Sequence, residues 1–478
     1  MSARTVAIIG AGWTGLQVAA VLRDCGYAVQ LYEALDDVGG TWHPGMAYAG
    51  LSLHTPSFRC QFHDYPQPSG QDPLQRLPAA DVFETCRAFA RDRGLVPHIA
   101  FRHRVRTISW DTARRVHRLA VHDEAGGVDH TAEFDVVVST QFNSPRVPAW
   151  PGQDQFEGQI LHASAVKDAV LERLAADGAR VVVVGGSKSA TDMALQLAGR
   201  RLPFTWLLRR MYWFLSYDKG YWNFRRNRPA SRVHRWLYFL GLGLARGTVS
   251  TRLVFEVWRR SGLLRCPGRP PADSTAFHHG WLDERQMDVL ETQTRQVYDE
   301  IARLDGRAVH TRGGQIIPCD VLICATGSDP IASPIALDVD GALIDYGAVE
   351  HVYRFSVIPA LPRLVFTGYW MFGFGPLNGY HRAAWLLDFI ERNRSTGELD
   401  AIARNEGQAP FQFRRGSFLF DGGANLLVTV KAMNNLMSKG IYSYADLKRY
   451  YRDIAVSYRY APIDGAHRFI EARRQKDR

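Results

Sequence analysis

Apolar residues along this chain form short uninterrupted runs that alternate with stretches of helical periodicity. Residues 5–9 are a strand-like run, a glycine turn follows, and apolar residues at helical spacing continue to residue 22. Residues 28–33, AVQLYE, predict the next strand. The plan recurs at 180–210, where RVVVVGG and FTWLLRR enclose a helical pattern. This order predicts two βαβ units, and therefore parallel sheets.

Three further segments extend these units into two domains. The runs at 134–140 and 319–327 each predict a strand that closes a dinucleotide-binding half, and the segment from about residue 360 predicts a strand, a glycine-rich loop and a helix that return to the first domain. We therefore expect an α/β protein with two Rossmann-like domains, the second inserted in the first. Residues 1–150 and 330–478 would form one domain, and residues 151–329 the other.

Residues 211–290 do not fit a plain nucleotide-binding domain. They are rich in Trp, Tyr, Phe and Arg, and their pattern predicts a mostly helical insertion. The aromatic density suits a substrate tunnel or an interface. A substrate tunnel, a peripheral contact with a membrane surface and a homodimer face all stay open.

Composition narrows the class of partner. The 478 residues carry a net charge of +10, and basic residues gather at 209–235, but no zinc-finger or recognition-helix pattern is present, so we expect no nucleic acid partner. The six cysteines include no C-x-x-C pair, so we expect neither a metal site nor a redox dithiol. The longest apolar run, at 236–245, is shorter than the roughly 20 residues that a membrane-spanning helix needs. No signal-peptide pattern opens the sequence, and we expect a cytoplasmic protein without a transmembrane segment.

The first glycine turn has the spacing of a dinucleotide site. Gly10, Gly12 and Gly15 enclose Thr14 between a predicted strand and a predicted helix. Glycines allow the tight turn and the close approach of a pyrophosphate, which the helix N-terminus favours. Glu33 ends the next strand, where a carboxylate accepts hydrogen bonds from a ribose and disfavours a 2′-phosphate. FAD or NAD therefore fits this site.

The second turn carries the opposite charge. Gly185, Ser187, Lys188 and Ser189 form it, and Arg209 and Arg210 follow the next strand where the first unit carries its glutamate. Guanidinium groups at this place suit a 2′-phosphate, so the second turn predicts NADPH. The alternative is that both arginines belong only to a solvated surface.

Four other places are candidates for cofactor contact. Gly40, Thr41 and Trp42 follow Glu33 closely, and Trp42 either stacks near a flavin or belongs to the core. His54 is a candidate for a flavin-contacting and catalytic residue, and the alternative is a hydrogen-bonded loop histidine. Asn378 precedes a predicted helix whose amides could face the flavin. The fourth place comprises Ala325, Thr326 and Gly327.

Taken in order, these motifs resemble the flavin-containing monooxygenases, the class B flavoprotein monooxygenases. The resemblance rests on GxGxxG, GGTW, GxSxSA and ATG, together with FxGxxxH at Phe156, Gly158 and His162. LHASAVKD is similar to the N- and S-oxygenating branch, although Val166 stands where that branch usually has an aromatic residue. The Trp or Pro that usually ends this motif in the Baeyer–Villiger branch is absent as well.

The resemblance implies an enzyme that binds FAD and NADPH and consumes dioxygen. It implies that NADPH reduces the flavin, that a C4a-hydroperoxyflavin forms, and that one oxygen atom passes to an amine nitrogen or a sulfide sulfur of a small organic substrate. A Baeyer–Villiger monooxygenase acting on ketones is the first alternative. An NADPH oxidase and a non-catalytic flavin sensor are the others. His162 lies between the two predicted domains, and we expect it to be structural and not a proton donor.

Overall fold

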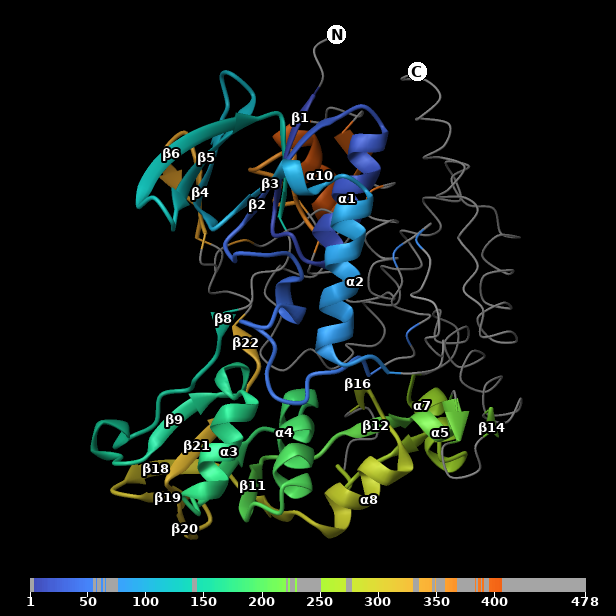
Figure 1. Cartoon of the computed structure of the whole chain (residues 1–478), viewed down its shortest axis with the longest axis vertical. Coiled ribbons are helices and arrows are strands. Elements are labelled where there is room, and N and C mark those ends of the chain that lie inside the picture. Colours follow the sequence, from blue (N-terminus) through green and yellow to red (C-terminus); the bar gives the residue numbers. More distant parts are fainter. Residues whose placement is uncertain are drawn as a thin grey trace.

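The chain forms two lobes that lie one above the other in Figure 1. The structure is a computed structural model. It describes residues 4–54, 57, 62, 65, 76–139, 144–220, 222–223, 228–229, 251–271, 277–329, 335–345, 349, 357–367, 383, 386–387, 389–390 and 395–405.

The upper lobe is built on a parallel sheet with the strand order β25-β7-β1-β2-β3. Its strands are β1 (Thr5–Ile9), β2 (Ala28–Glu33), β3 (Ile99–Phe101), β7 (Val136–Ser139) and β25 (Leu364–Phe366). Helices α1 (Trp13–Asp24), α2 (Ala79–Asp92) and α10 (Thr396–Asn405) and the 3-10 turns η1 (Gly40–Trp42) and η3 (Val96–His98) belong to the same lobe. This order is that of a dinucleotide-binding sheet with β1 at its centre.

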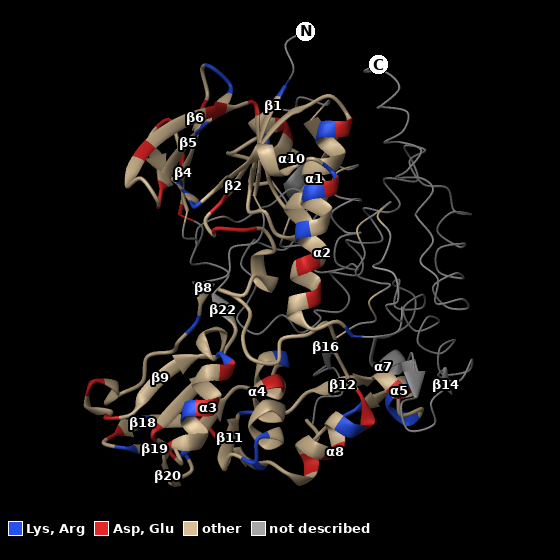
Figure 2. Cartoon of the chain, in the orientation of Figure 1, with Lys and Arg blue, Asp and Glu red and all other residues tan. Residues whose placement is uncertain are grey.

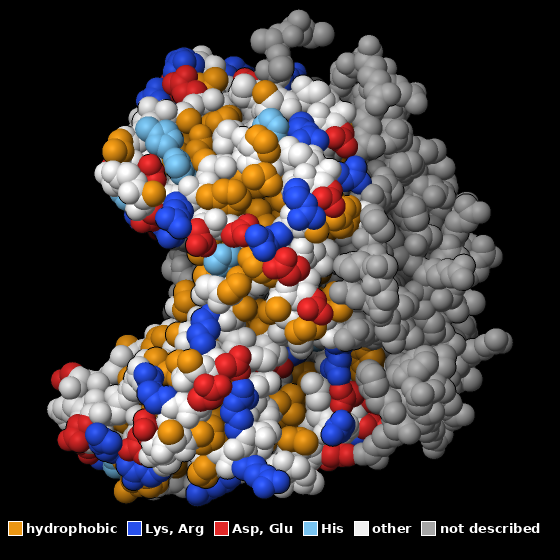
Figure 3. Space-filling view, viewed as in Figure 1, with side chains coloured by type: hydrophobic (Ala, Val, Ile, Leu, Met, Phe, Trp, Pro, Cys, Tyr) orange, Lys and Arg blue, Asp and Glu red, His pale blue; other side chains and the backbone are white. Residues whose placement is uncertain are grey.

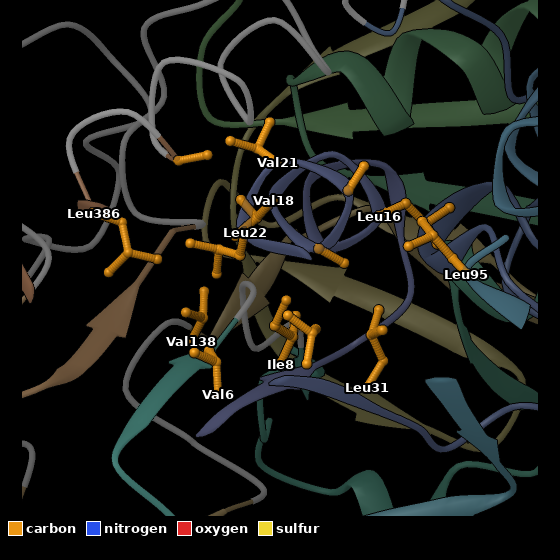
Figure 4. Close-up of a cluster of buried hydrophobic side chains, with 14 of the residues drawn as sticks. Val6, Ile8, Leu16, Val18, Val21, Leu22, Leu31, Leu95, Val138 and Leu386 are labelled. Atoms are coloured by element: carbon orange, nitrogen blue, oxygen red, sulfur yellow. The ribbon is translucent and has the colours of Figure 1, made fainter. Parts of the chain in front are cut away.

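The core of this lobe lies between α1 and the sheet (Figure 4). Leu16, Val18 and Leu22 of α1 belong to one buried cluster with Ile8 of the sheet and Leu386 from the C-terminal part of the chain. All five side chains are buried, and burial of each contributes about 1.5–3 kcal/mol. Helical spacing in α1 and consecutive apolar residues in β1 therefore produce one continuous core, which fixes the turn between them.

The lower lobe repeats this plan with the strand order β17-β11-β10-β21-β9. Its strands, also parallel, are β9 (Gln159–His162), β10 (Val181–Val184), β11 (Phe204–Leu208), β17 (Arg295–Tyr298) and β21 (Val321–Cys324). Helices α3 (Asp168–Ala176) and α4 (Lys188–Gly199) and the 3-10 turns η4 (Gln153–Gln155) and η5 (Ala163–Ala165) complete it. Two sheets of the same order confirm the predicted fold class of two Rossmann-like units.

A second sheet that the sequence pattern did not predict accompanies the parallel sheet in each lobe. In the upper lobe, β4 (His103–Asp111), β5 (Val116–Asp123) and β6 (Val128–Phe134) join β23 (Ala336–Val339) and β24 (Ala342–Leu343). In the lower lobe, β18 (Ile301–Asp305), β19 (Ala308–Thr311) and β20 (Ile316–Pro318) form an antiparallel meander.

The described part of 211–290 contains strands as well as helices. Strands β12 (Trp213–Ser216), β15 (Leu264–Arg265) and β16 (Phe277–Leu282) form one sheet, and β13 (Trp222–Asn223) pairs with β14 (Arg228–Pro229). The helices are α5 (Tyr217–Gly220), α7 (Thr251–Arg260) and α8 (Glu284–Thr292). Helices are thus present in the insertion alongside strands, while much of the insertion lies outside the described residues.

Two short strands cross between the lobes. β8 (Ser144–Pro145) leads into the lower lobe and β22 (Ser328–Asp329) leads out, and the two pair antiparallel. The Arg146 amide adds a hydrogen bond to the Gly327 carbonyl at 3.0 Å. Figure 3 shows a deep notch between the lobes on this side. The predicted domain limits, 150 and 329, lie close to these strands.

The described surface has mixed charge. Acidic and basic residues are interspersed over the elements of both lobes in Figure 2. Within the basic span at 209–235, positions 221, 224–227 and 230–235 lie outside the described residues. No helix in the described ranges is long and apolar enough to cross a bilayer.

Candidate functional site

The first glycine turn lies directly between β1 and α1. Gly10 has φ +97°, a conformation that suits glycine, and its amide donates to the Tyr32 carbonyl of β2 at 2.8 Å. A Cβ on Gly12 would lie 3.5 Å from the Cα of Gly40, so this turn and the η1 loop are in contact. Thr14 and Gly15 lie in the first turn of α1. The glycines therefore keep this edge open to a phosphate, and the α1 N-terminus faces the same turn.

Glu33 closes the site from the end of β2. Its carboxylate is almost fully buried and accepts from the Ala11 amide at 2.7 Å and from the Leu35 amide at 3.0 Å. Two oxygens offer about four acceptor positions, so capacity remains for ribose hydroxyls. The glycine cradle and this oriented carboxylate fit the adenosine diphosphate part of a dinucleotide without a 2′-phosphate.

An aromatic group stands beside the first turn. The rings of Trp13 and Trp42 meet edge-on with centroids 5.9 Å apart, and Phe62 lies 6.0 Å from Trp13. Both tryptophans pack against buried Leu53 and Leu77. Trp42, the last residue of η1, is therefore part of an apolar wall, which agrees with the core alternative and leaves stacking on a flavin a prediction. Thr41, next to it, is exposed.

The second turn joins three of the predicted motifs. Gly185 has φ +131°, and a side chain there would collide with the Ala325 carbonyl. A Cβ on Gly186 would lie 2.6 Å from the Arg210 carbonyl. The turn at 185–189, the end of β11 and the segment at 325–327 thus meet at one edge of the lower sheet. Ser187 is the N-cap position of α4, and Ser189 lies in its first turn.

The three basic side chains at this turn have different surroundings. Arg209 is 77% exposed, and its Nε lies 3.9 Å from a Glu300 carboxylate oxygen, which is a long distance for an ion pair. Its charge is therefore available to a ligand. The Arg210 guanidinium lies over the Tyr212 ring, 5.3 Å from its centroid. Lys188 donates to buried Asp192 four residues on. Its positive charge is already balanced, which the sequence prediction of a phosphate-binding lysine did not anticipate.

The FxGxxxH motif connects strand β9 to the second turn. A Cβ on Gly158 would lie 2.5 Å from the Phe156 ring and 2.7 Å from the Asp320 carbonyl, so only glycine fits there. His162 ends β9, its Nε2 donates to the Gly327 carbonyl at 2.9 Å, and its Nδ1 accepts from Ser164. Burial lowers the pKa of His162, which favours the neutral ring.

A segment that the sequence did not single out reaches from the upper lobe onto the lower one. We call residues 44–50, which follow η1, the docking segment. The Ala49 amide donates to the Val166 carbonyl at 2.7 Å, and the Tyr48 hydroxyl donates to Asp192 at 2.8 Å. Lys167 donates to three carbonyls of the segment: Pro44 at 3.2 Å, Gly45 at 3.1 Å, and Ala47.

Two predicted site residues lie at the edge of the described residues or outside them. His54 is partly buried beside Leu53, but neighbouring positions 55–56 and 58–61 lie outside the described residues. Asn378 lies outside them as well. Their predicted contacts with a flavin stay predictions. Thr326 donates its hydroxyl to the Arg146 carbonyl, which ties the 325–327 segment to the crossing strands.

Neither thiols nor metal ligands form a second reactive centre in the described parts of the chain. Their cysteines form no disulfide, and burial raises the pKa of Cys319 and of Cys324 to about 12. Nor do these parts contain a His, Cys, Asp and Glu group that could hold a metal ion.

A family model described as flavin-binding monooxygenase-like matches residues 3–225 of this chain. That range includes the first turn, Glu33, the FxGxxxH motif, the second turn and both arginines.

Individual relatives extend this likeness. A probable flavin-containing monooxygenase 1 from Arabidopsis thaliana is 24% identical over 448 residues, which is 82% of this chain and 83% of the plant protein. A senecionine N-oxygenase from Tyria jacobaeae is 28% identical over 211 residues, covering 41% of this chain and 45% of its own length. The solved structure of an oxidized steroid monooxygenase bound to NADP has a TM-score of 0.65 at 17% identity, over 92% of this chain and 98% of that one.

Proposed function

Because the chain belongs to the flavin-binding monooxygenase-like family, we propose that it is an FAD- and NADPH-dependent monooxygenase that oxygenates a soft nucleophile. The substrate atom would be an amine nitrogen or a sulfide sulfur of a small organic molecule. Membership of the class of flavin-dependent monooxygenases is the premise. The coenzyme, the substrate atom and the site residues are the proposal.

One observation supports the cofactor assignment most strongly. The chain holds two turns of the same βαβ geometry, with buried Glu33 beside the first and Arg209 exposed beside the second. A carboxylate at this place suits free ribose hydroxyls, and a guanidinium suits a 2′-phosphate. FAD at the first turn and NADPH at the second therefore match the two charges.

The residues around each turn would then have separate tasks. Gly10, Gly12 and the α1 N-terminus would receive the FAD pyrophosphate, and Glu33 would orient the adenosine ribose. The Trp13–Trp42 wall would keep water from the first turn. Exclusion of water matters because the bound flavin would carry out the chemistry with dioxygen. His162 would hold the 325–327 segment against β9.

Oxygenation of nitrogen or sulfur is favoured over attack on a ketone by the LHASAVKD segment and by the N-oxygenase relative. The decisive experiment supplies purified holoprotein with NADPH, ¹⁸O₂ and, in turn, a tertiary amine, a dialkyl sulfide and a cyclic ketone. We expect labelled N-oxide or sulfoxide to form, with one molecule of dioxygen consumed for each NADPH oxidised. A labelled lactone would instead identify Baeyer–Villiger chemistry. Hydrogen peroxide as the only product with every substrate would identify an oxidase, and an unreduced flavin would identify a sensor.

Coenzyme choice is tested separately at Arg209. Arg209→Ala should lower the apparent affinity for NADPH about five- to tenfold, because an exposed charged hydrogen bond contributes about 1 kcal/mol. The apparent affinity for NADH should not change. Anaerobic flavin reduction at varied coenzyme concentration measures both affinities. Arg312→Ala is the matched control, since Arg312 is 72% exposed and pairs with the same Glu300 at 3.2 Å. Equal losses for NADPH and NADH in Arg209→Ala would contradict the assignment.

A further inference from the structure

One face of helix α4 lies against the docking segment. Lys188, Asp192 and Gln196 recur every four residues, so they share this face. Asp192 accepts from Tyr48, and Gln196 abuts Gly50, whose φ of +76° and lack of a side chain allow the approach. The helix that begins at the second turn therefore contacts the segment that follows the first lobe's GGTW loop.

The pair of Lys188 with Asp192 does little for the helix itself. A lysine in the first turn opposes the helix macrodipole, and a lysine four residues before an acid is the weaker orientation of such a pair. Both side chains are nonetheless largely buried, at 19% and 5% exposure. The N-terminus of a helix favours an anion, and the Lys188 ammonium adds positive charge at this place.

Asp192 stands between the two lobes with both oxygens in use. Oδ1 accepts from the Lys188 ammonium, and Oδ2 accepts from the Tyr48 hydroxyl at 2.8 Å. Since Asp192 is buried, these two donors replace the hydrogen bonds that its carboxylate would make with water. If one donor leaves, the hydrogen bond from the remaining donor to the carboxylate becomes stronger.

We propose that Asp192 is a positioning residue that competes with the nicotinamide nucleotide's phosphate for Lys188 and so couples nucleotide binding to the docking segment. The inference rests on the proposed function, because it places that nucleotide at the second turn. When a phosphate draws Lys188 away, Tyr48 becomes the remaining donor to Asp192, and the docking segment is held more tightly. By linkage, the Tyr48 hydrogen bond in turn favours nucleotide binding.

Two substitutions give opposite expectations. Asp192→Asn removes the negative charge that retains Lys188, so NADP⁺ should bind about three- to tenfold more tightly. Tyr48→Phe removes the donor that replaces Lys188, so NADP⁺ should bind about three- to tenfold more weakly, consistent with a charge-assisted hydrogen bond. General destabilisation would weaken binding in both variants.

The experiment measures NADP⁺ affinity by calorimetry on FAD-loaded protein, together with deuterium uptake at residues 45–50 with and without NADP⁺. In the wild type we expect NADP⁺ to slow exchange of this segment, and in both variants that effect should be lost. Lys188→Gln should show slow exchange whether or not NADP⁺ is present, because Tyr48 is then the permanent donor.

Tyr65→Phe is the matched control, since the Tyr65 hydroxyl donates to Asp92 at 2.7 Å inside the upper lobe. It should change neither affinity nor exchange at 45–50. Shifts of affinity in the same direction for Asp192→Asn and Tyr48→Phe, or NADP⁺-dependent protection that survives in Tyr48→Phe, would overturn the coupling. Those results would leave the proposed function intact, whereas wild-type protein without NADP⁺ binding would overturn both.

Discussion

His162 joins two motifs through its two ring nitrogens. With the proton on Nε2 it donates to Gly327, and Nδ1 accepts from Ser164. We expect His162→Ala to slow NADPH-driven flavin reduction about fivefold, since one such bond contributes about 1 kcal/mol, while the FAD content stays that of the wild type. Rapid-mixing absorbance under anaerobic conditions measures the first quantity, and the flavin-to-protein absorbance ratio measures the second.

Ser164→Ala is the control for His162, because it removes a partner of Nδ1 and keeps the bond to Gly327. It should reduce the flavin at nearly the wild-type rate. Wild-type reduction kinetics in His162→Ala would show that the link to Gly327 has no influence on the second turn.

Local motifs predicted individual residues where the chemistry depends on neighbours in sequence. Gly10, Gly185 and Glu33 stand where the motif predicted them, because a turn and the strand after it are local features. Tyr48 and Asp192 are 144 positions apart, and no local pattern links them. The i, i+4 spacing of Lys188 and Asp192 was visible, but it equally describes a solvated helix face.

Strand β5 contains a buried histidine, His117, that should make the stability of the fold depend on pH. His117 is fully buried, its Nε2 donates to the Pro362 carbonyl at 3.0 Å, and desolvation lowers its pKa to about 4. The unfolded chain binds a proton near pH 6.5, but the folded chain does so only near pH 4. Stability is therefore full above about pH 6.5 and falls as the pH drops towards 4, by on the order of 3 kcal/mol.

Urea unfolding between pH 7 and pH 4 measures this effect. His117→Gln keeps an N–H donor for Pro362 without a titrating ring, so it should lose much of this pH dependence. His122→Gln, on the same strand at a partly exposed histidine, should retain it. Equal slopes in the wild type and His117→Gln would contradict the assignment to His117.

Strands were predicted where burial on both faces leaves an uninterrupted apolar run. β10 is four valines, and β1 is almost entirely apolar. β4 and β5 lie in a sheet with one solvent-facing side, where Arg104, Arg106 and Arg118 interrupt the pattern. β9 is an edge strand of four residues, too short to show a period of its own.

At the scale of the whole molecule, FAD should stabilise the upper lobe and, through η1, the docking segment. A ligand at 100 times its dissociation constant contributes about 2.7 kcal/mol, so removing FAD should lower the apparent melting temperature by several degrees. It should also speed deuterium exchange at residues 45–50, which follow η1 directly.

Readdition identifies the part of the cofactor responsible. FAD should restore the melting temperature of the apoprotein, while riboflavin should not, because riboflavin lacks the adenosine diphosphate that Gly12 and Glu33 are proposed to hold. Identical melting curves with and without FAD would contradict a site at the first turn.

The repeated unit made the two-sheet fold predictable, since the same turn and strand spacing occurs twice in the sequence. How the lobes contact each other was not predictable, because it depends on the docking segment and on Arg76. That residue pairs with Asp283 and lies 4.8 Å over the Tyr217 ring. Such contacts join residues about 120 to 210 positions apart.

The pairing of β8 with β22 has a consequence for the ancestry and engineering of this chain. Ser144 and Asp329 are direct partners, so the polypeptide departs from and returns to the upper lobe at neighbouring points. A segment whose two ends lie this close together can be inserted, lost or exchanged as a unit without a change in the strand order of the upper sheet. Homologous domains with other coenzyme preferences could accordingly replace residues 144–329.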